Sequence, residues 1–314
     1  MIRHKRKNKI LSLVGMLLVF TLILTACGST KEEQKVAKID AIESEETDSG
    51  GQVADIANPE ENEEDELEDE EIQESSSATS EETATTPTVK NLTVATYNIA
   101  AGKLVNFDYS VIATDIRNSG ADIVALQEID QMTLRNGSQD TMAILAAATG
   151  MSYYAFAPAL SPYQEGEYGI GVLSKYPIES YMYFDLPKLS TKEEQRVLLH
   201  TEINVGGTTF DFFVTHGQQS SIREQLTAAN DYIASSSKFI YAGDFNTSNY
   251  ANFQLIGNSY TIIGSANPIL TTASHSFDNM VISNNIQSSN VRTINTGHSD
   301  HYMLLANVVI PVGN

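Results

Sequence analysis

The segment SKFIYAGDFN (residues 237–246) runs from an apolar strand pattern directly into a carboxylate and an amide. In an extended backbone, residues two positions apart point to the same side. The side chains of Asp244 and Asn246 are therefore predicted to converge on one point. Converging oxygen atoms favour a hard cation, so this strand end is a candidate metal site.

The same pattern, a strand that meets polar residues, recurs along the chain. Strand patterns end or begin beside Asn98, Glu128, His216, Asp278, Asp300 and His301. Each of these residues alone is most often a turn former or a helix cap. Polar residues gathered at one edge of packed sheets form a cleft, so together they predict one site.

Strand and helix patterns fill the region from residue 91 onward. The strands are predicted at 92–98, 122–128, 169–175, 196–204, 209–216, 237–245, 260–264, 278–283, 290–295 and 302–310. The helices are predicted at 109–119, 140–149 and 221–235, with Asp108 capping the first and Gly150 ending the second. The aromatic segment 151–163 is interpreted as a core strand, with a ligand-facing wall as the alternative. Continuous apolar strands predict sheets that are covered on both faces, with helices outside.

The N-terminal residues have the composition of a secretory signal. Residues 1–30 carry five basic side chains and no acid, and the apolar run 10–24 is 15 residues long. That run is shorter than the roughly 18 to 20 residues of a membrane-spanning helix, so a signal over residues 1–26 is predicted. LTAC (24–27) resembles the bacterial lipobox. This resemblance implies a lipid on Cys27 and a location on the outer face of the bacterial cell membrane.

Residues 27–90 are predicted to form an acidic, disordered linker. Residues 31–90 hold 21 acidic and four basic side chains, and such a stretch buries too little apolar surface to fold. Cys27 is the only cysteine, so no intramolecular disulfide can form. Residues 91–314 hold ten basic and 19 acidic side chains and are long enough for one large domain. Their net charge of −9 argues against tight binding to duplex nucleic acid.

Eight motifs in this domain carry a family resemblance. They are TYNI (96–99), LQE (126–128), YGIGVLSKYPI (168–178), QRV (195–197), THG (215–217), GDFN (243–246), FDNMVIS (277–283) and SDHYML (299–304). In this order they resemble the motifs of the endonuclease/exonuclease/phosphatase superfamily. The resemblance spans nearly all of residues 92–310. It implies a four-layered α/β/β/α sandwich of two mixed β-sheets flanked by helices, and a metal-dependent phosphoric ester hydrolase.

The resemblance also implies a role for each matching residue. The metal positions are Asn98, Glu128, Asp244, Asn246 and Asp300. The catalytic positions are His301, Asp278, His216 and Asp244, and the phosphate-binding positions are Asn246, Arg196 and Tyr168. Mg²⁺ is the expected cofactor because it prefers oxygen ligands and keeps several waters, and Mn²⁺ is an expected substitute.

The expected chemistry is attack of water on a phosphate ester. His301 takes the proton from the water, while Asp278 fixes the tautomer of the imidazole and stabilises the imidazolium. Arg135 is a further candidate for holding an anionic substrate, although a loop arginine is usually solvated. Only 31 residues separate Asn246 from Asp278, which leaves little room for a large substrate-recognition insertion.

Three functions are compatible with these features. The first is a phosphodiesterase that acts outside the membrane on phospholipid head groups or small phosphodiesters. The second is an extracellular nuclease, with DNA or RNA as substrate only. The third is an inactive surface binding module, which is least expected because every expected catalytic position holds a chemically competent residue. A monomer is expected.

Overall fold

The structure, a computed structural model, describes residues 89–257 and 260–312. Residues 1–88, which hold the predicted signal, Cys27 and most of the predicted linker, lie outside the described residues. Within the described part, no helix is both long and apolar enough to span a membrane.

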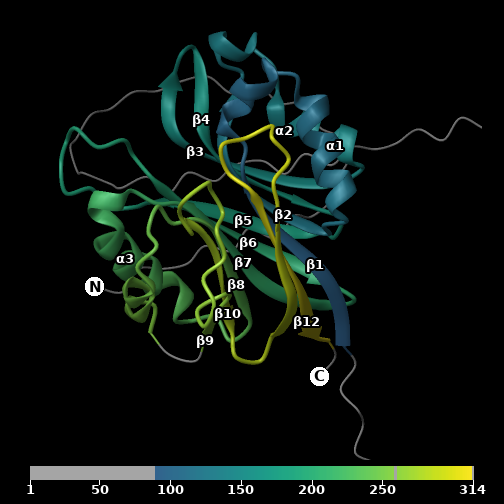
Figure 1. The fold of residues 1–314 in the computed structure, drawn as a ribbon, viewed down its shortest axis with the longest axis vertical. Coiled ribbons are helices and arrows are strands. Elements are labelled where there is room, and N and C mark those ends of the chain that lie inside the picture. The colour runs from purple at the N-terminus through teal and green to yellow at the C-terminus, as the bar shows by residue number, and fades with distance from the viewer. Residues whose placement is uncertain (1–88, 258–259, 313–314) are drawn as a thin grey trace, which may run out of the picture. The chain divides into compact units, whose positions relative to one another are not determined.

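Two six-stranded sheets and three α-helices make up the described part (Figure 1). The first sheet contains β1 (Val89–Asn98), β2 (Ile123–Gln131), β3 (Tyr153–Tyr163), β4 (Gly166–Ser174), β11 (Gln287–Ile294) and β12 (Met303–Pro311). The second contains β5 (Ile178–Asp185), β6 (Val197–Val205), β7 (Thr208–His216), β8 (Phe239–Asp244), β9 (Tyr260–Ile262) and β10 (Asp278–Ser283). The helices are α1 (Tyr109–Ser119), α2 (Thr141–Thr149) and α3 (Ile222–Ile233). The 3₁₀ turns are η1 (Ala100–Val105), η2 (Leu134–Asn136), η3 (Gln219–Ser221) and η4 (Tyr250–Leu255).

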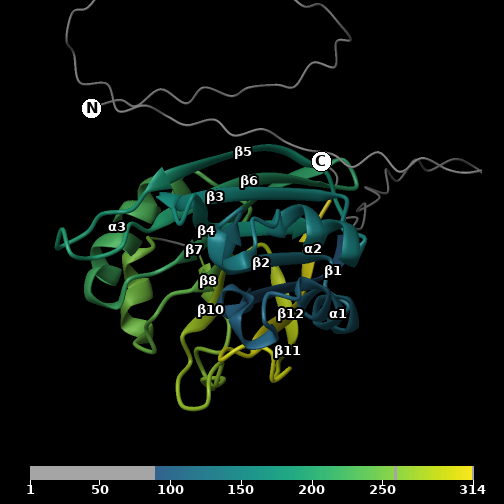
Figure 2. The same ribbon diagram turned by 90° about the horizontal axis from the view of Figure 1, so that it is seen from above.

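The hydrophobic clusters show that these elements pack as four layers. One cluster lies between the sheets and joins residues such as Val94 of β1 to Phe212 of β7. A second packs α1 and α2 against the first sheet, and a third packs α3 against the second sheet. In both ribbon views α3 lies at the opposite side of the sheets from α1 and α2 (Figure 2). The predicted α/β/β/α sandwich is therefore confirmed.

The strand directions bring the polar strand ends together at one edge. The first sheet has the order β11-β12-β1-β2-β4-β3 and the second β5-β6-β7-β8-β10-β9. β1 pairs parallel with β2, and β7 pairs parallel with β8, with Asn98 opposite Gln127 and His216 opposite Asp244. β10 and β12 run antiparallel to β8 and β1, so they begin where those strands end. We call this side of both sheets the polar edge.

Asp108 and Gly150 end their helices as predicted, and Asp140 is a further cap that the structure adds. The side chain of Asp108 accepts a hydrogen bond from the backbone N–H of Ser110, and that of Asp140 accepts one from Ala143. Gly150 ends α2 with a φ of 73°, a left-handed conformation that glycine adopts at little cost. These caps fix where α1 and α2 start and where α2 stops on the outer face of the first sheet.

The sequence patterns missed β5. It pairs with β6 at the border of the second sheet, and its polar and tyrosine-rich sequence IESYMYFD lacks the continuous apolar run of a central strand. The aromatic segment 151–163 contains β3, at the border of the first sheet. Ala155 and Ala157 of β3 belong to the cluster between the sheets, in agreement with the core interpretation of this segment.

Candidate active site

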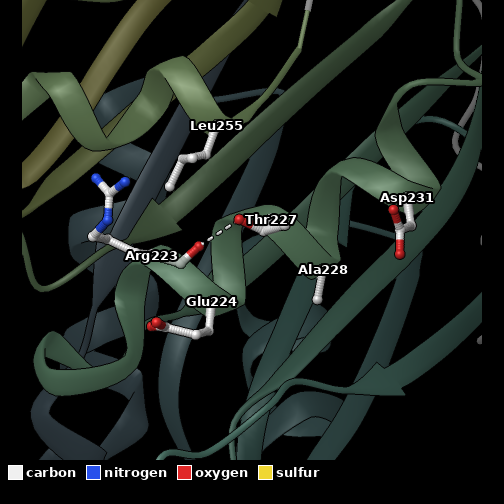
Figure 3. Close-up of a pocket in the computed structure, with 6 residues that line it drawn as sticks. All are labelled: Arg223, Glu224, Thr227, Ala228, Asp231 and Leu255. Atoms are coloured by element: carbon white, nitrogen blue, oxygen red, sulfur yellow. Dashed lines mark hydrogen bonds between the residues drawn. The ribbon is translucent and has the colours of Figure 1, made fainter.

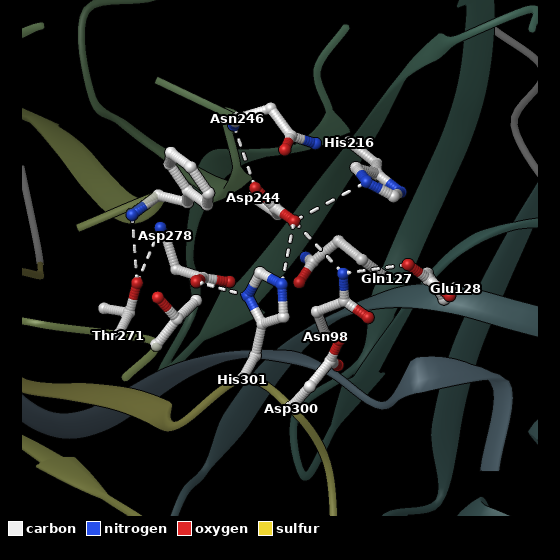
Figure 4. Close-up of polar contacts among 12 residues, drawn as sticks. Asn98, Gln127, Glu128, His216, Asp244, Asn246, Thr271, Asp278, Asp300 and His301 are labelled. Atoms are coloured by element: carbon white, nitrogen blue, oxygen red, sulfur yellow. Dashed lines mark hydrogen bonds and ion pairs between the residues drawn. The ribbon is translucent and has the colours of Figure 1, made fainter. Parts of the chain in front are cut away.

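One carboxylate oxygen lies at the centre of the polar edge (Figure 4). Oδ2 of Asp244 accepts a hydrogen bond of 3.1 Å from Nδ2 of Asn98. The same oxygen lies 3.5 Å from Nε2 of His216 and 3.6 Å from Nε2 of His301. Asn98 belongs to the first sheet and Asp244 and His216 to the second, so the centre is shared by both sheets.

Asp244 reaches this position because β7 and β8 approach closely. A Cβ atom on Gly243 would lie 2.1 Å from the carbonyl oxygen of Thr215, so only glycine fits there. The prediction that the backbone stays extended from Asp244 to Asn246 is wrong. Asn246 has a φ of 50°, its N–H donates to Oδ1 of Asp244, and its Nδ2 donates to the carbonyl of Gly217. The chain therefore turns after Asp244, and Asn246 braces the loop that follows His216.

Asp278 and His301 form a buried pair beside Asp244. Nδ1 of His301 lies 2.7 Å from Oδ2 of Asp278. Asp278 stands at the start of β10, where Oγ1 of Thr271 accepts hydrogen bonds of 3.0 Å from the N–H groups of Phe277 and Asp278. The pairing leaves Nε2 of His301 directed at Asp244, away from Asp278.

His216 has its tautomer fixed by Arg196. Nη1 of Arg196 lies 3.2 Å from Nδ1 of His216. A guanidinium can only donate, so Nδ1 must accept and the ring hydrogen resides on Nε2. Burial, together with the charges of Arg196 and His301, lowers the pKa of His216 well below its ordinary value. His216 therefore presents a neutral ring with an Nε2–H donor toward the centre.

Glu128 enters the site through a β-bulge. The pairing of β2 with β4 shifts register between Gln127 and Ile129, and Glu128 has a φ of 59°. Backbone conformations of this kind are costly for a residue with a side chain and cluster at functional sites. The bulge brings Oε1 of Glu128 to 3.3 Å from Nδ2 of Asn98, next to Asp244.

The remaining predicted site residues lie around this centre. Asp300 is exposed and follows Ser299, whose hydroxyl donates to the backbone carbonyl of Asn98 at 2.7 Å. Tyr168 is 9% exposed, and burial, with the nearby charge of Glu128, raises the pKa of its phenol well above the ordinary value. The nearby guanidinium of Arg196 acts in the opposite direction and lowers this pKa.

Arg135 is occupied by a buried carboxylate. Its guanidinium pairs with both oxygens of Asp130, which is fully buried. The guanidinium carbon also lies 5.2 Å from the ring centre of Tyr163 and 5.8 Å from that of Tyr168. Because Asp130 neutralises its charge, Arg135 is not free to bind an anionic substrate. Its guanidinium packs beside the ring of Tyr168 instead, and so supports that wall of the site.

The charges of the centre favour a bound cation. Burial and the neighbouring Asp278 raise the pKa of Asp244 to about 6, because desolvation and a second negative charge both disfavour the carboxylate, and the opposing effect of His301 is smaller. Burial lowers the pKa of His301, but the hydrogen bond and charge of Asp278 outweigh it and raise that pKa to about 9. A cation beside Asp244 would stabilise both carboxylates and oppose the protonation of His301.

The donor atoms fit a hard divalent cation. The carboxylates of Glu128 and Asp244 both accept hydrogen bonds from Nδ2 of Asn98, and Asp300 adds a carboxylate nearby. The amide oxygen of Asn98 accepts from the N–H of Ala100, so Asn98 would turn its oxygen to the centre to serve as a ligand. Mg²⁺ and Mn²⁺ are held by such oxygen ligands. A second grouping, Asp244, Asp278 and His301, has ligand atoms within 4.8 Å of one another and is a possible metal site. In that grouping, however, Nδ1 of His301 and Oδ2 of Asp278 are already hydrogen-bonded to each other.

Sequence reasoning missed several residues that build the site. Thr271 fixes the start of β10, and Ser299 ties the loop before β12 to Asn98. Gln127 is fully buried beside the centre, and its Oε1 accepts a hydrogen bond from the hydroxyl of Thr96. Neither Thr271 nor Ser299 lies in a periodic apolar pattern, so nothing in the local sequence marks their contacts. Gln127 lies in the LQE motif, but the motif assigned a role only to Glu128.

An open groove of about 410 Å³ lies elsewhere, between α3 and η4 (Figure 3). It is lined by Arg223, Glu224, Thr227, Ala228, Asp231 and Leu255. None of these residues is among those that surround Asp244 at the polar edge. We therefore assign the chemistry to the centre around Asp244 and not to this groove.

Comparison with known proteins identifies related sequences and structures. The model of the Endonuclease/Exonuclease/phosphatase family matches residues 95–301, which include every motif residue of the centre from Asn98 to His301. No curated protein matches the chain at a significant level.

Solved structures share the fold at low sequence identity. A family protein from Bacteroides thetaiotaomicron is 16% identical, with a TM-score of 0.55, and the match covers 72% of this chain and 100% of that one. A mannosyl-6-phosphatase from the same organism is 15% identical, with a TM-score of 0.54 and coverage of 69% and 99%. TDP2 from D. rerio, complexed with a single-strand DNA product, is 16% identical, with a TM-score of 0.56 and coverage of 69% and 98%. At these identities the likeness establishes the fold alone.

Proposed function

Because the chain belongs to the endonuclease/exonuclease/phosphatase family of metal-dependent phosphoester hydrolases, we propose that it is a Mg²⁺-dependent phosphodiesterase that acts on phospholipid head groups or small phosphodiesters. The observation that carries the proposal is the position of Asp244. Its Oδ2 atom lies within 3.6 Å of the ring nitrogens of two histidines and next to the amide of Asn98. This is the arrangement that water attack on a phosphate ester requires, with a proton acceptor, a proton donor and cation ligands around one point.

Asn98, Glu128 and Asp244 are the residues that we assign to the cation. Nδ2 of Asn98 lies 3.1 Å from Oδ2 of Asp244 and 3.3 Å from Oε1 of Glu128, so carboxylates from both sheets meet at one amide. A cation between these carboxylates would take the oxygen of the Asn98 amide in place of its nitrogen. A bound divalent cation would neutralise charge on the non-bridging phosphate oxygens. Asp300, which is exposed nearby, is the candidate for a further ligand from the solvent side.

His301 is the proposed proton acceptor. Its Nε2 faces the centre, while Nδ1 is held at 2.7 Å by Asp278. When Nε2 takes a proton from the attacking water, the ring becomes an imidazolium that Asp278 stabilises. Such a positioned base contributes about 10²- to 10⁴-fold to the rate.

His216 is the proposed donor to the phosphate. Arg196 fixes the hydrogen on Nε2, and burial keeps the ring neutral. An Nε2–H directed at the centre can donate to a phosphate oxygen or to the oxygen that leaves. Tyr168, whose phenol lies close enough to Arg196 and Glu128 to feel their charges, forms the adjoining wall of the phosphate site.

The charge of the domain supports a small or lipid-borne substrate over a nucleic acid. Residues 91–314 carry a net charge of −9, whereas nucleic-acid binding draws on clustered Lys and Arg. Arg135 is neutralised by Asp130 and adds no free positive charge to the site.

We also propose that the enzyme works outside the cell, anchored through a lipid on Cys27. The support is the basic and apolar leader followed by LTAC (24–27). A head group of the same membrane would then be within reach of the tethered domain.

A substrate panel tests the function. The chain from residue 28 onward would be offered bis-p-nitrophenyl phosphate, p-nitrophenyl phosphate, phosphatidylcholine vesicles and supercoiled plasmid, each with Mg²⁺ or with a chelator. We expect hydrolysis of the diester and the lipid with Mg²⁺ and none with the chelator. Plasmid nicking far faster than lipid hydrolysis would instead establish a nuclease, and turnover that persists in the chelator would contradict a metal-dependent site.

A further inference from the structure

Most of the exposed large apolar residues of the described part lie on loops at the polar edge. Six large hydrophobic residues of the described part are exposed. One of them, Val89, lies at the start of β1, and the other five lie on loops. The five are Leu104 (57% exposed), Met132 (47%), Leu134 (56%), Leu189 (61%) and Leu270 (50%). We call these five residues the apolar rim. Single exposed hydrophobic residues are ordinary, but their collection around one site is not.

Each member of the rim lies close in sequence to a residue of the site. Leu104 follows Asn98, Met132 and Leu134 follow Glu128, Leu189 precedes Arg196, and Leu270 precedes Asp278. The separations are between four and eight residues. The loops that carry them all leave or enter strands at the polar edge, where β1 and β2 end and β6 and β10 begin. Val89 begins β1 and therefore lies at the opposite edge.

The rim is spread over four separate loops. Leu104 belongs to η1, and Leu134 to η2, while Leu189 lies between β5 and β6 and Leu270 between β9 and β10. A protein partner binds best through a contiguous, desolvated cluster of apolar side chains. A fluid apolar phase can instead accept each side chain independently. The dispersed arrangement therefore favours a lipid surface.

Two of the rim leucines have a lysine beside them in sequence. Lys103 precedes Leu104, and Lys188 precedes Leu189, and both lysines are exposed. At a membrane interface a leucine side chain enters the acyl region while a neighbouring ammonium group stays at the level of the phosphates. Such an ammonium group is attracted to anionic lipid head groups.

We propose that the apolar rim seats the polar edge on a phospholipid bilayer, so that the site meets lipid head groups at the membrane surface. This inference deepens the proposed function and rests on it for the identity of the substrate. It assigns the five residues of the apolar rim to membrane contact, and Lys103 and Lys188 to contacts with the lipid phosphates.

The chain has enough length before the domain for this orientation. Val89 begins β1 at the edge opposite the site, so a tethered domain must turn its far edge toward the membrane. From Cys27 to residue 88 the sequence has 62 residues. At about 3.3 Å per residue, a chain of that length can reach at most about 200 Å. The tether therefore permits the rim to face the membrane.

Vesicle binding tests the proposal directly. The chain from residue 28 onward, which lacks Cys27 and cannot be lipid-modified, would be sedimented with phosphatidylcholine vesicles, alone or mixed with phosphatidylglycerol. Combining Leu104→Ser with Leu189→Ser should lower the fraction bound by about tenfold for each leucine. The rate of lipid hydrolysis should fall in parallel, while kcat/KM for soluble bis-p-nitrophenyl phosphate stays unchanged. Lys103→Gln with Lys188→Gln should remove any gain from phosphatidylglycerol.

Val89→Ser is the matched control, because it removes another exposed apolar side chain, 47% exposed, from the opposite edge. We expect it to leave vesicle binding and both rates unchanged. Vesicle binding by the leucine double variant equal to that of the parent would overturn the proposal. So would leucine-dependent self-association without vesicles, measured by sedimentation velocity, since it would assign the rim to a second copy of the chain. Leucine-dependent vesicle binding without any turnover of the soluble diester would support the rim and contradict the proposed function instead.

Discussion

Asp244 carries the densest set of contacts among the charged residues of the site. One of its oxygens contacts an amide and faces two histidines, although the residue itself is only 1% exposed. A carboxylate in such surroundings is costly unless positive charge or hydrogen bonds compensate it. The surroundings of Asp244 therefore favour a bound cation. They also place the two histidines in different electrostatic environments, so that His216 is neutral while the pKa of His301 is raised.

The role of His301 can be tested with a variant that keeps a donor toward Asp278. His301→Asn should lower kcat for bis-p-nitrophenyl phosphate by about 10²- to 10⁴-fold, since the proton acceptor is lost. Steady-state kinetics with saturating Mg²⁺ would measure this effect. His298→Asn is the control, because His298 pairs with Asp115 and is not among the contacts of Asp244. Equal losses of kcat in both variants would contradict the assignment.

Glu128 should govern the affinity for the cation. Glu128→Gln removes one negative charge from the ligand set, so the Mg²⁺ concentration for half-maximal activity should rise by at least about tenfold. A titration of activity against Mg²⁺ would show the shift. Glu202→Gln, which changes a carboxylate in β6 that is hydrogen-bonded to Ser180, serves as the control. An unchanged Mg²⁺ dependence in Glu128→Gln would remove Glu128 from the metal site.

Strand pairing, at the element scale, determines how closely the two histidines and Asp244 approach. β7 and β8 lie so close at Gly243 that its neighbour across the pair, Thr215, leaves no room for a Cβ atom. On the other sheet the bulge at Glu128 brings its side chain to Asn98, the residue that also contacts Asp244. Both features are departures from a regular strand, and both position site residues.

Gly243→Ala should therefore destabilise the domain and disturb its site. Forcing β7 and β8 apart is expected to cost about 2 to 3 kcal/mol of the free energy of unfolding. Urea denaturation followed by circular dichroism would measure it. Gly257→Ala, where an added Cβ would lie no closer than 3.6 Å to its neighbours, should be nearly neutral. A stable, fully active Gly243→Ala variant would contradict the close approach of these strands.

Most strands could be predicted because central strands read as apolar runs that end in turn residues. β5 could not, since a border strand exposes half of its side chains and tolerates the polar and tyrosine-rich sequence found there. The apolar strand pattern could not predict the turn at Asn246 either. The left-handed backbone there is accompanied by hydrogen bonds to Asp244 and Gly217, which the pattern does not encode. Long-range contacts of this kind, such as that of Ser299 with Asn98, leave no local trace in the sequence.

The whole molecule brings the site together from both sheets. Asn98 and Glu128 come from the first sheet, and His216 and Asp244 from the second, so the site exists only when the sheets are packed. The order of the motifs along the chain predicted this sandwich correctly. The packing of the sheets, with the cluster between them, then fixes the distances that the sequence could not supply.

Cation binding should in consequence stabilise the folded molecule. A ligand that binds only the folded state at one hundred times its Kd adds about 2.7 kcal/mol to the free energy of unfolding. Mg²⁺ should raise the Tm of the chain from residue 28 onward, whereas K⁺ at equal ionic strength should not. Glu128→Gln should lose most of this gain. A Tm that responds equally to both salts would show that no folded-state cation site is present.

The most direct measurement is an anomalous-scattering map from crystals grown with Mn²⁺. The account predicts a single strong Mn²⁺ peak bounded by Asn98, Glu128 and Asp244, with Nε2 of His301 facing the water or phosphate beside the ion. A Mn²⁺ peak elsewhere, with these three side chains still bonded only to one another, would contradict it.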